Sequence, residues 1–421
     1  MADEKTGAPV SGTILVVGGG ISGITTALEA AEVGYEVFIV EKNPYLGGRV
    51  AQLNKYFPKL CPPTCGLEIN FQRIKKNKNI KWFTLTEVEK ISGGPGNYDV
   101  ALKTNPRYVN GNCTCCGKCA DACDVEMPNE FNFGMDKRKA AYLPFEMAFP
   151  QRYVLDPSII GKETAQKCKD ACEYKAIDLD DKVKTFNIKA ASIVWATGWN
   201  PYDAKKIDNL SFGWVKNVIT NMMMERLAAA NGPTKGKIVR PSDGKEVNNI
   251  AFVQCAGSRD ENHLSFCSYI CCLASLKQTT YIREANPKSK ATIFYIDLRT
   301  PGRYEKFYKK VKADANVSFI KGKVAKIDED PATKDVVVTV EDTLSGKKIK
   351  KTFDMVVLAT GMEPSTASVK VPGNAKYDEN NFVISDEILS TGCVKKPSDV
   401  MSSGQTATGT ALKAIQTLVR R

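Results

Sequence analysis

The sequence has 421 residues, of which 43% are hydrophobic and 25% are charged, values typical of a soluble globular protein with two or three domains. The formal net charge is +12, but the basic residues are scattered and form no long run, which argues against nucleic acid as a partner. No apolar run approaches the ~18 residues of a membrane span, and the first residues show no signal region. The sequence therefore predicts a cytoplasmic protein that reaches a membrane only through partner subunits.

The first elements form a strand–helix–strand unit. Residues 14–17 are an apolar run typical of a buried parallel strand, and residues 21–33 place apolar side chains at helical spacing. Residues 36–40 form a second apolar run. This order predicts a Rossmann-like βαβ unit.

A G-x-G-x-x-G motif joins the first strand to the helix. Gly18 permits the tight turn, Gly20 lets the backbone approach a pyrophosphate, and Gly23 lets the helix pack on the strand. Glu41, eighteen residues past Gly23, is placed to accept a hydrogen bond from a ribose hydroxyl. The motif with its flanking elements predicts a dinucleotide site.

Three further segments favour FAD over NAD. A Gly-Gly-Arg turn follows Glu41, and two apolar strands each end in Ala-Thr-Gly. These features resemble the two-dinucleotide-binding-domain flavoproteins, in which the Gly-Gly-Arg turn lies against the flavin side of FAD. The resemblance assigns FAD contacts to Gly47, Gly48, Arg49, Ala196, Thr197, Gly198, Ala359, Thr360 and Gly361.

Cys61 and Cys65 follow the Gly-Gly-Arg turn in a loop with two prolines. Three roles remain open for them: a redox dithiol beside the flavin, an additional cluster ligand, or a structural role. Residues 92–97 are rich in glycine and predict a turn or a short linker.

Cysteines at C-x2-C-x2-C-x3-C spacing follow: Cys113, Cys116, Cys119 and Cys123. This is the ferredoxin spacing for a four-iron cluster, in which the fourth cysteine usually ligates a second cluster. Of a second run only Cys168 and Cys172 are present, so one cluster is complete and the other lacks two ligands. We therefore expect one [4Fe–4S] cluster here on Cys113, Cys116, Cys119 and Cys172, with Cys115 as a packed free thiol.

A second set of thiols has a spacing unknown in ferredoxins: Cys255, Cys267, Cys271 and Cys272. Residues 249–254 predict a strand of a second Rossmann-like unit, and this strand leads into the cysteines where a nicotinamide-binding protein has its second glycine motif. Four soft thiolates suit iron–sulfur chemistry. We expect a second [4Fe–4S] cluster here, with buried structural thiols as the alternative.

The remaining predicted helices and strands fit the same two-domain flavoprotein pattern. Residues 221–230 predict a helix whose methionines serve packing, and residues 291–296, 336–340 and 355–359 predict strands. Before the last helix such flavoproteins usually have Gly-Asp, where this chain has Gly404-Gln405-Thr406, so that either Gln405 or Thr406 is expected to replace the aspartate at the FAD ribityl chain.

The predicted fold is thus an α/β two-dinucleotide-binding-domain flavoprotein with an inserted ferredoxin-like iron–sulfur segment. The predicted division is a tail (1–11), an FAD-binding domain (12–106, 182–200 and 366–421), the insert (107–181) and a degenerate NAD-like domain (201–365).

The nucleotide motif, the ferredoxin cysteines, residues 137–150 with Tyr153, and the unusual second cysteine set together resemble the flavin-binding A subunit of heterodisulfide reductase. This sequence is shorter than that protein and shows no counterpart of its extra cluster domains, and we expect one insert cluster where that protein has two. With Cys61-Pro-Pro-Thr-Cys65, the short form is similar to the corresponding A subunit of the quinone-interacting membrane-bound oxidoreductase of sulfate reducers.

This resemblance implies an FAD-dependent electron-transfer subunit that works between the menaquinone pool and adenylylsulfate reductase. It implies partners in the same complex, namely a haem-bearing membrane subunit and a second flavin and iron–sulfur subunit. It also implies a peripheral position on the inner face of the membrane. Two alternatives are a heterodisulfide-reductase-type subunit and an NAD(P)H-dependent thiol–disulfide reductase that uses Cys61 and Cys65.

Overall fold

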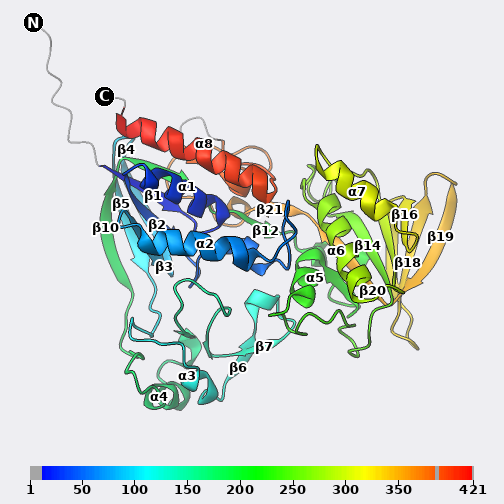
Figure 1. Ribbon diagram of the computed structural model, residues 1–421, viewed down its shortest axis with the longest axis horizontal. Helices are drawn as coiled ribbons and strands as arrows, with labels where there is room; N and C mark the ends of the chain where they lie inside the picture. The colour runs from blue at the N-terminus through cyan, green and yellow to red at the C-terminus, as the bar shows by residue number, and fades with distance from the viewer. Residues whose placement is uncertain (1–11, 385–387, 420–421) are drawn as a thin grey trace, which may run out of the picture. The chain divides into compact units, whose positions relative to one another are not determined.

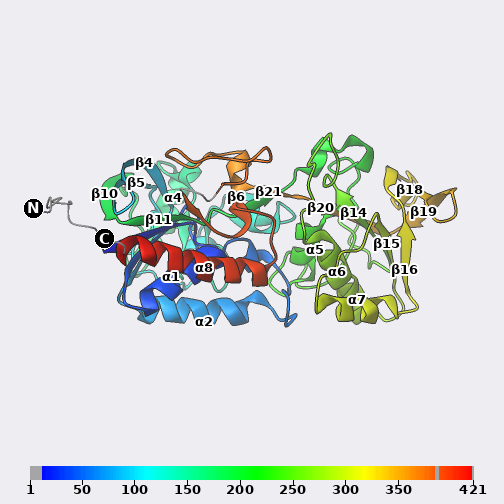
Figure 2. The ribbon, with the colours of Figure 1, turned by 90° about the horizontal axis from the view of Figure 1, so that it is seen from above.

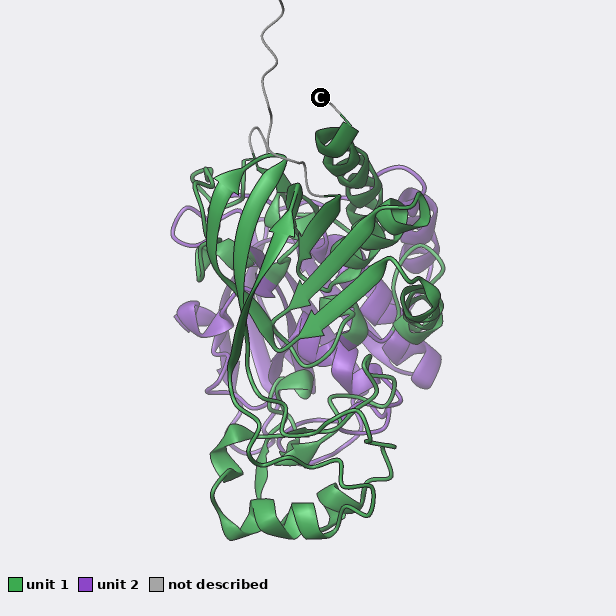
Figure 3. Ribbon diagram, turned by 90° about the vertical axis from the view of Figure 1, so that its left-hand side faces the viewer, with its two compact units in different colours: residues 1–51, 55–199, 364–421 green, residues 52–54, 200–363 purple. Residues whose placement is uncertain are grey.

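The structure is a computed structural model that describes residues 12–384 and 388–419, so the predicted tail lies outside the described residues. The chain divides into two compact units, coloured separately in Figure 3. Unit 1 contains residues 1–51, 55–199 and 364–421, and unit 2 contains residues 52–54 and 200–363. None of the helices in the described ranges combines the length and the hydropathy needed to cross a bilayer.

Unit 1 is built on a parallel five-stranded sheet of order β22-β11-β1-β2-β3. Helices α1, α2 and α8 lie beside one another along it (Figures 1 and 2), and a three-stranded antiparallel sheet of order β10-β5-β4 packs with it. The elements are β1 Thr13–Val17, α1 Ile21–Glu32, β2 Glu36–Glu41, α2 Pro63–Lys76, β3 Ile80–Thr84, β4 Thr86–Gly94, β5 Asn97–Thr104, β10 Lys184–Ala190, β11 Ser192–Trp195, β22 Leu389–Ser390 and α8 Val400–Val419.

The apolar run of β1 is buried on both faces, as the sequence pattern predicts for a central parallel strand. Ile14 and Val16 pack in one core with the helices, while Leu15 and Val17 pack in a second core with the antiparallel sheet. Successive side chains of a strand point to opposite faces, so one short segment supports both layers. Residues 92–97 form the tip of the β4–β5 hairpin, in which residues 95 and 96 are the turn, rather than a linker.

The cysteine-bearing segment between β5 and β10 belongs to unit 1 and consists of short elements around a small core of its own. These are α3 Lys118–Asp121, β6 Glu126–Pro128, β7 Lys137–Lys139, β8 Ala141–Tyr142, β9 Val154–Leu155 and α4 Glu163–Asp170. Cys119, Cys123 and Cys168 are buried in this core. The thiols are therefore held by long-range packing rather than by extended secondary structure.

Unit 2 has a second parallel five-stranded sheet, of order β13-β20-β14-β15-β16, with a three-stranded antiparallel sheet, β17-β18-β19, packed with it. Its elements are β13 Val218–Thr220, α5 Asn221–Ala228, β14 Asn249–Ala256, α6 Cys271–Ala285, β15 Lys290–Tyr295, α7 Tyr304–Lys312, β16 Val317–Lys321, β17 Val324–Glu329, β18 Val336–Asp342, β19 Lys347–Phe353 and β20 Met355–Thr360. Two short strands, β12 Trp199–Pro201 and β21 Met362–Pro364, pair with each other. Each predicted strand and helix of this unit agrees with the structure to within two residues at either end.

Candidate flavin and iron–sulfur sites

Two glycines of the nucleotide motif are required by the protein's own packing. Gly18 has a φ of +111°, and a Cβ atom there would lie 2.3 Å from the carbonyl oxygen of Ala196. A Cβ atom on Gly23 would lie 1.8 Å from the carbonyl oxygen of Gly18. Both positions therefore exclude any side chain, whether or not a nucleotide is bound.

Gly20 is different. Its backbone is extended, with φ −77° and ψ −177°, and a Cβ atom there would meet only the Cα atom of Gly48, at 3.9 Å. The fold would thus accept a side chain at a position that precedes helix α1, whose first turn has no side-chain cap. This open space beside free helix N–H groups fits a pyrophosphate.

The Gly-Gly-Arg turn packs directly on the nucleotide turn. The N–H of Gly47 donates to the carbonyl of Gly19 at 2.7 Å, and a Cβ atom on Gly48 would lie 2.9 Å from the Cα atom of Gly20. The half-buried Arg49 donates from Nε to the carbonyl of Trp199 at 3.2 Å. Burial lowers the pKa of Arg49, and Tyr45 and Glu41 oppose that shift.

Glu41 links the end of β2 to the same turn. Its Oε2 atom accepts from the N–H of Gly19 at 2.7 Å, and its Oε1 atom accepts from the backbone and side-chain nitrogens of Asn43 at 2.8 and 2.7 Å. Burial raises the pKa of Glu41, and the bonds from Asn43 and Gly19 oppose that rise. Because a carboxylate has about four acceptor positions, one position remains for a ribose hydroxyl.

The two Ala-Thr-Gly segments have different surroundings. In the first, Thr197 Oγ1 accepts from the hydroxyl of Ser365 at 2.7 Å, beside the contact of Ala196 with Gly18. The second, Ala359 to Gly361, lies at the buried end of β20 in unit 2. There the carbonyl of Thr360 accepts from the thiol of Cys271 at 3.7 Å, so this segment supports the second cysteine set.

The expectation that Gly404 and Gln405 precede the last helix is wrong, because both lie inside α8 and Gln405 is exposed. The residues at the carboxyl end of the sheet are Thr391 and Gly392, directly after β22. Gly392 has a φ of +68°, and a Cβ atom there would lie 2.2 Å from Ser22 Oγ in the first turn of α1. Sequence patterns miss this position because β22 has only two residues.

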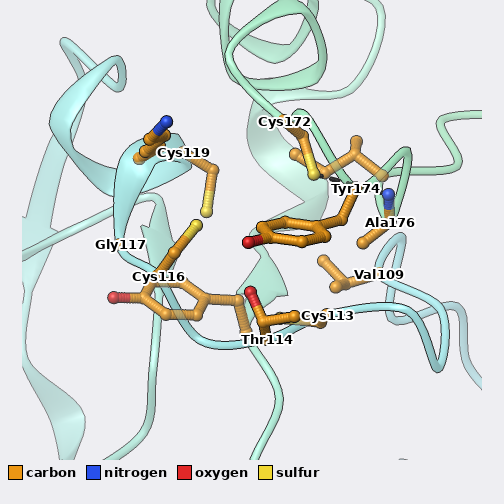
Figure 4. Close-up of a pocket in the computed structure, with 12 residues that line it drawn as sticks. Val109, Cys113, Thr114, Cys116, Gly117, Cys119, Cys172, Tyr174 and Ala176 are labelled. Carbon is orange, nitrogen blue, oxygen red and sulfur yellow. Dashed lines mark hydrogen bonds between the residues drawn. The ribbon is translucent and has the colours of Figure 1, made fainter.

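Four thiols line one pocket in unit 1, shown in Figure 4: Cys113, Cys116, Cys119 and Cys172. The sulfur atoms of Cys116 and Cys119 point toward each other in this view. Burial raises the pKa of Cys119 to about 12, with further contributions from Cys113, Cys172 and Cys116. Thiolates that raise one another's pKa need a cationic partner to coexist, and iron supplies one.

The surroundings of Cys172 also suit a cluster ligand. The N–H of Ala176 donates to Cys172 Sγ at 3.4 Å, and such bonds tune iron–sulfur potentials. Within residues 12–384 and 388–419, no three His, Cys, Asp or Glu side chains converge closely enough to hold a single metal ion. A four-iron cluster differs from an ion because each thiolate binds a separate iron atom, so its ligands surround a volume.

Cys123 and Cys168 do not line this pocket but are buried together. Burial raises the pKa of Cys168 to about 12, with the thiol of Cys123 as the next contribution. Cys123 Sγ also donates to the carbonyl of Val125 at 3.6 Å. Cys115 lies outside the pocket as well, and its pKa is raised to about 11 by burial and by Cys113.

The second set lies between β14 and α6 in unit 2. Cys255 sits in a bulge of β14 with a φ of +56°, a conformation that is strained for a residue with a side chain. Cys271 and Cys272 are the first residues of α6, where helix N–H groups favour negative charge. Burial raises the pKa of Cys271 well above its ordinary value, and Cys255, Cys272 and Cys267 add to that rise.

Cys61 lies two residues before α2 and forms a bridge with Tyr56, whereas Cys65 lies in the first turn of α2 and is exposed. Burial raises the pKa of Tyr56, with smaller contributions from Cys61 and Cys65, so the three side chains form one group. A Cβ atom on Gly66 would lie 2.5 Å from the hydroxyl of Tyr56, so glycine makes room for it.

Comparisons with known proteins agree with this architecture. Residues 13–61 match the FAD dependent oxidoreductase family. Thioredoxin reductase of T. acidophilum is similar in fold, with a TM-score of 0.51 over 97% of this chain and 98% of that chain at 15% identity. That of Lactococcus lactis gives a TM-score of 0.52 over 98% and 100% at 13% identity. The chain thus has the two-dinucleotide-binding-domain fold, and its nucleotide turn matches that of FAD-dependent oxidoreductases.

Other proteins are similar to this chain at higher sequence identity. An iron–sulfur A subunit of CoB–CoM heterodisulfide reductase from Methanopyrus kandleri is 40% identical over 86% of this chain and 55% of its own length. The A subunit of H2:CoB–CoM heterodisulfide,ferredoxin reductase from Methanothermobacter thermautotrophicus is 34% identical over 99% of this chain and 65% of its own length. The chain is therefore similar to the heterodisulfide reductase A subunits over most of its own length, and it spans between half and two thirds of the length of these relatives.

Proposed function

We propose that this chain is an FAD and iron–sulfur electron-transfer subunit with two [4Fe–4S] clusters. The observation that carries the proposal is the meeting of Cys113, Cys116, Cys119 and Cys172 around one pocket of unit 1, the unit that also contains the nucleotide turn. The relatives support it, since they are named as iron–sulfur or ferredoxin-linked subunits.

FAD passes electrons in pairs or singly, whereas each cluster passes one at a time. The role of the protein is to hold these groups and to set their reduction potentials. Gly20 leaves the backbone open to the approach of a pyrophosphate, Gly48 lets the Gly-Gly-Arg turn pack on Gly20, and Glu41 would accept from the ribose at its remaining acceptor position. Ala176 donates to the sulfur of Cys172 and Tyr269 donates to the sulfur of Cys267, at 3.4 Å in both cases.

The second cluster is proposed on Cys255, Cys267, Cys271 and Cys272. Two observations support this cluster. The other three thiols of the set raise the pKa of Cys271, and the backbone of Cys255 is strained, as is typical of functional sites. The second Ala-Thr-Gly segment lies beside this set, where the carbonyl of Thr360 is 3.7 Å from Cys271 Sγ.

For the physiological role, we propose transfer between the menaquinone pool and adenylylsulfate reductase. The partners would be a haem-bearing membrane subunit and a second flavin and iron–sulfur subunit, which would hold this chain on the cytoplasmic face of the membrane. The similarity of Cys61-Pro-Pro-Thr-Cys65 to the quinone-interacting complex favours this role.

The alternative is a heterodisulfide-reductase-type subunit, which the names of the relatives favour. The test is anaerobic purification with co-purifying subunits, followed by flavin, iron and sulfide analysis and by reduction with menaquinol or NADH. We expect one FAD, about eight iron atoms per chain and flavin reduction by menaquinol but not by NADH. Flavin without iron would refute the electron-transfer assignment, and a complex that reduces a heterodisulfide but ignores menaquinol would favour the alternative.

A further inference from the structure

A buried glutamine directly precedes the second cysteine set in unit 2. Gln254 lies in β14, one residue before Cys255, and is only 5% exposed. Neither the Nε2 nor the Oε1 atom of its side chain has a hydrogen-bond partner among the residues that the structure describes. An unpaired buried amide costs free energy, and native proteins keep few of them. The observation therefore points to a partner that the protein atoms do not supply.

The side chain of Gln254 lies on the helix side of the parallel sheet of unit 2. Val253 and Ala256 pack in the same core with the antiparallel sheet, and the bulge between them takes up the extra residue. Because successive side chains of a strand alternate, Gln254 points to the opposite face of the sheet. Helix α6 packs against β14 and β20 (Figure 1), and none of its residues, all of which are described, belongs to that core. The amide therefore lies between β14 and α6.

Helix α6 contributes a second unpaired polar group. The hydroxyl of Ser275 is fully buried, and no described residue bonds to it. Ser275 follows Cys271 by four residues, so the two side chains lie on the same face of the helix, one turn apart. Strand β14 and helix α6 thus each bring an unpaired donor next to a residue of the second cysteine set.

The exposed side of this set already has donors from the backbone. The N–H of Tyr269 donates to Cys267 Sγ at 3.4 Å. Burial raises the pKa of Cys272, and a hydrogen bond from the backbone N–H of Arg299 opposes that rise. Tyr269 and Arg299 are both exposed. An iron–sulfur cluster brings sulfide ions as further acceptors, so on its buried side it would accept from the two unpaired donors.

We propose that the side-chain amide of Gln254 donates a hydrogen bond to a sulfur atom of the second cluster and thereby sets its reduction potential, with Ser275 as a second donor. The reduced cluster carries more negative charge on its sulfur atoms, so an N–H donor stabilises it more than the oxidised cluster and raises the potential. The inference rests on the proposed function, since it requires a cluster on the second cysteine set.

The test replaces Gln254 by methionine, which has a similar length but no donor, and Ser275 by alanine, singly and together. Thr292→Val is the matched control, because Thr292 is buried on the neighbouring strand β15, beside Ala251 and away from the cysteines. The full chain is reconstituted anaerobically with iron and sulfide, and redox titrations followed by EPR give the midpoint potential of each cluster. Each variant is also measured with Cys172→Ser, which should leave only the signal of the second cluster.

We expect Gln254→Met to keep about eight iron atoms per chain and to lower the midpoint potential of the second cluster. Ser275→Ala should lower it less, the combined variant should lower it most, and Thr292→Val should keep the wild-type value. The insert cluster should not change in any of them.

An unchanged potential in Gln254→Met, with the second cluster in place, would refute the donor role and identify a buried water as the partner of the amide. If Gln254→Met does not fold, Ser275→Ala carries the test, and an unchanged potential there would refute the proposal. Wild-type protein with only about four iron atoms per chain would instead refute the second cluster, and with it that part of the proposed function.

Discussion

The carboxylate of Glu41 accepts a hydrogen bond from the backbone N–H of Gly19 at 2.7 Å, across the turn that the nucleotide motif forms. The acidic residue at the end of β2 thus stabilises the turn itself as well as being placed for a ribose. Burial raises its pKa, so the folded apoprotein favours the protonated form more than the unfolded chain does.

The raised pKa of Glu41 predicts that the folding stability of the apoprotein depends on pH. Since the folded-state pKa is raised, the stability contributed by Glu41 is fully present below the ordinary glutamate value of 4.5 and is lost as the pH rises through the higher folded value. Glu41→Gln should remove that part of the slope while keeping an oxygen for Gly19. Urea unfolding of the apoprotein at a series of pH values measures the slope. An unchanged slope in the variant would contradict the raised pKa.

Gly20→Val should fold and lose FAD, because the structure leaves room for a Cβ atom at this position and the side chain would occupy the space expected for the pyrophosphate. Gly23→Ala should instead destabilise the fold by at least about 1–3 kcal/mol, since its Cβ atom would meet a backbone carbonyl. Flavin content and thermal unfolding separate the two effects. Gly404→Ala and Gly409→Ala, which have open space in α8, serve as controls and should keep full flavin. A Gly20→Val protein with full flavin would contradict the assignment of the turn.

Substitution of Cys168, within α4, and of Cys172, just after it, should affect the iron content differently. Cys172→Ser should remove about four iron atoms per chain, because Cys172 lines the pocket with three other thiols. Cys168→Ser should keep all the iron, because its thiol is buried against Cys123. Iron and sulfide analysis with EPR after reconstitution provides the measurement. Iron loss in the Cys168 variant, or none in the Cys172 variant, would overturn the ligand set.

NADH and NADPH should leave the flavin oxidised. The turn between β14 and α6 would carry a nicotinamide nucleotide in a Rossmann unit, but here Cys271 and Cys272 occupy the start of the helix. Anaerobic absorbance at the flavin maximum, with dithionite as the positive control, provides the test. Rapid bleaching by either nucleotide would favour the thiol–disulfide reductase alternative with Cys61 and Cys65.

Local signals in the sequence are enough to specify the class of the fold and the position of the nucleotide turn. Glycine spacing, the apolar runs around it and Glu41 are signals of this kind, because a turn and its flanking elements depend on residues that are close together in the chain. The ferredoxin spacing likewise groups Cys113, Cys116 and Cys119, which are near neighbours in the sequence.

The meeting of distant segments depends on tertiary packing instead. The fold buries Cys168 against Cys123, and it places Gly392 rather than Gly404 at the end of the sheet. It also brings Asn54 to Glu225, a contact across 171 residues that no pattern predicts. These contacts join residues far apart in the chain, where a two-residue strand or a single buried carboxylate has no periodicity to reveal it.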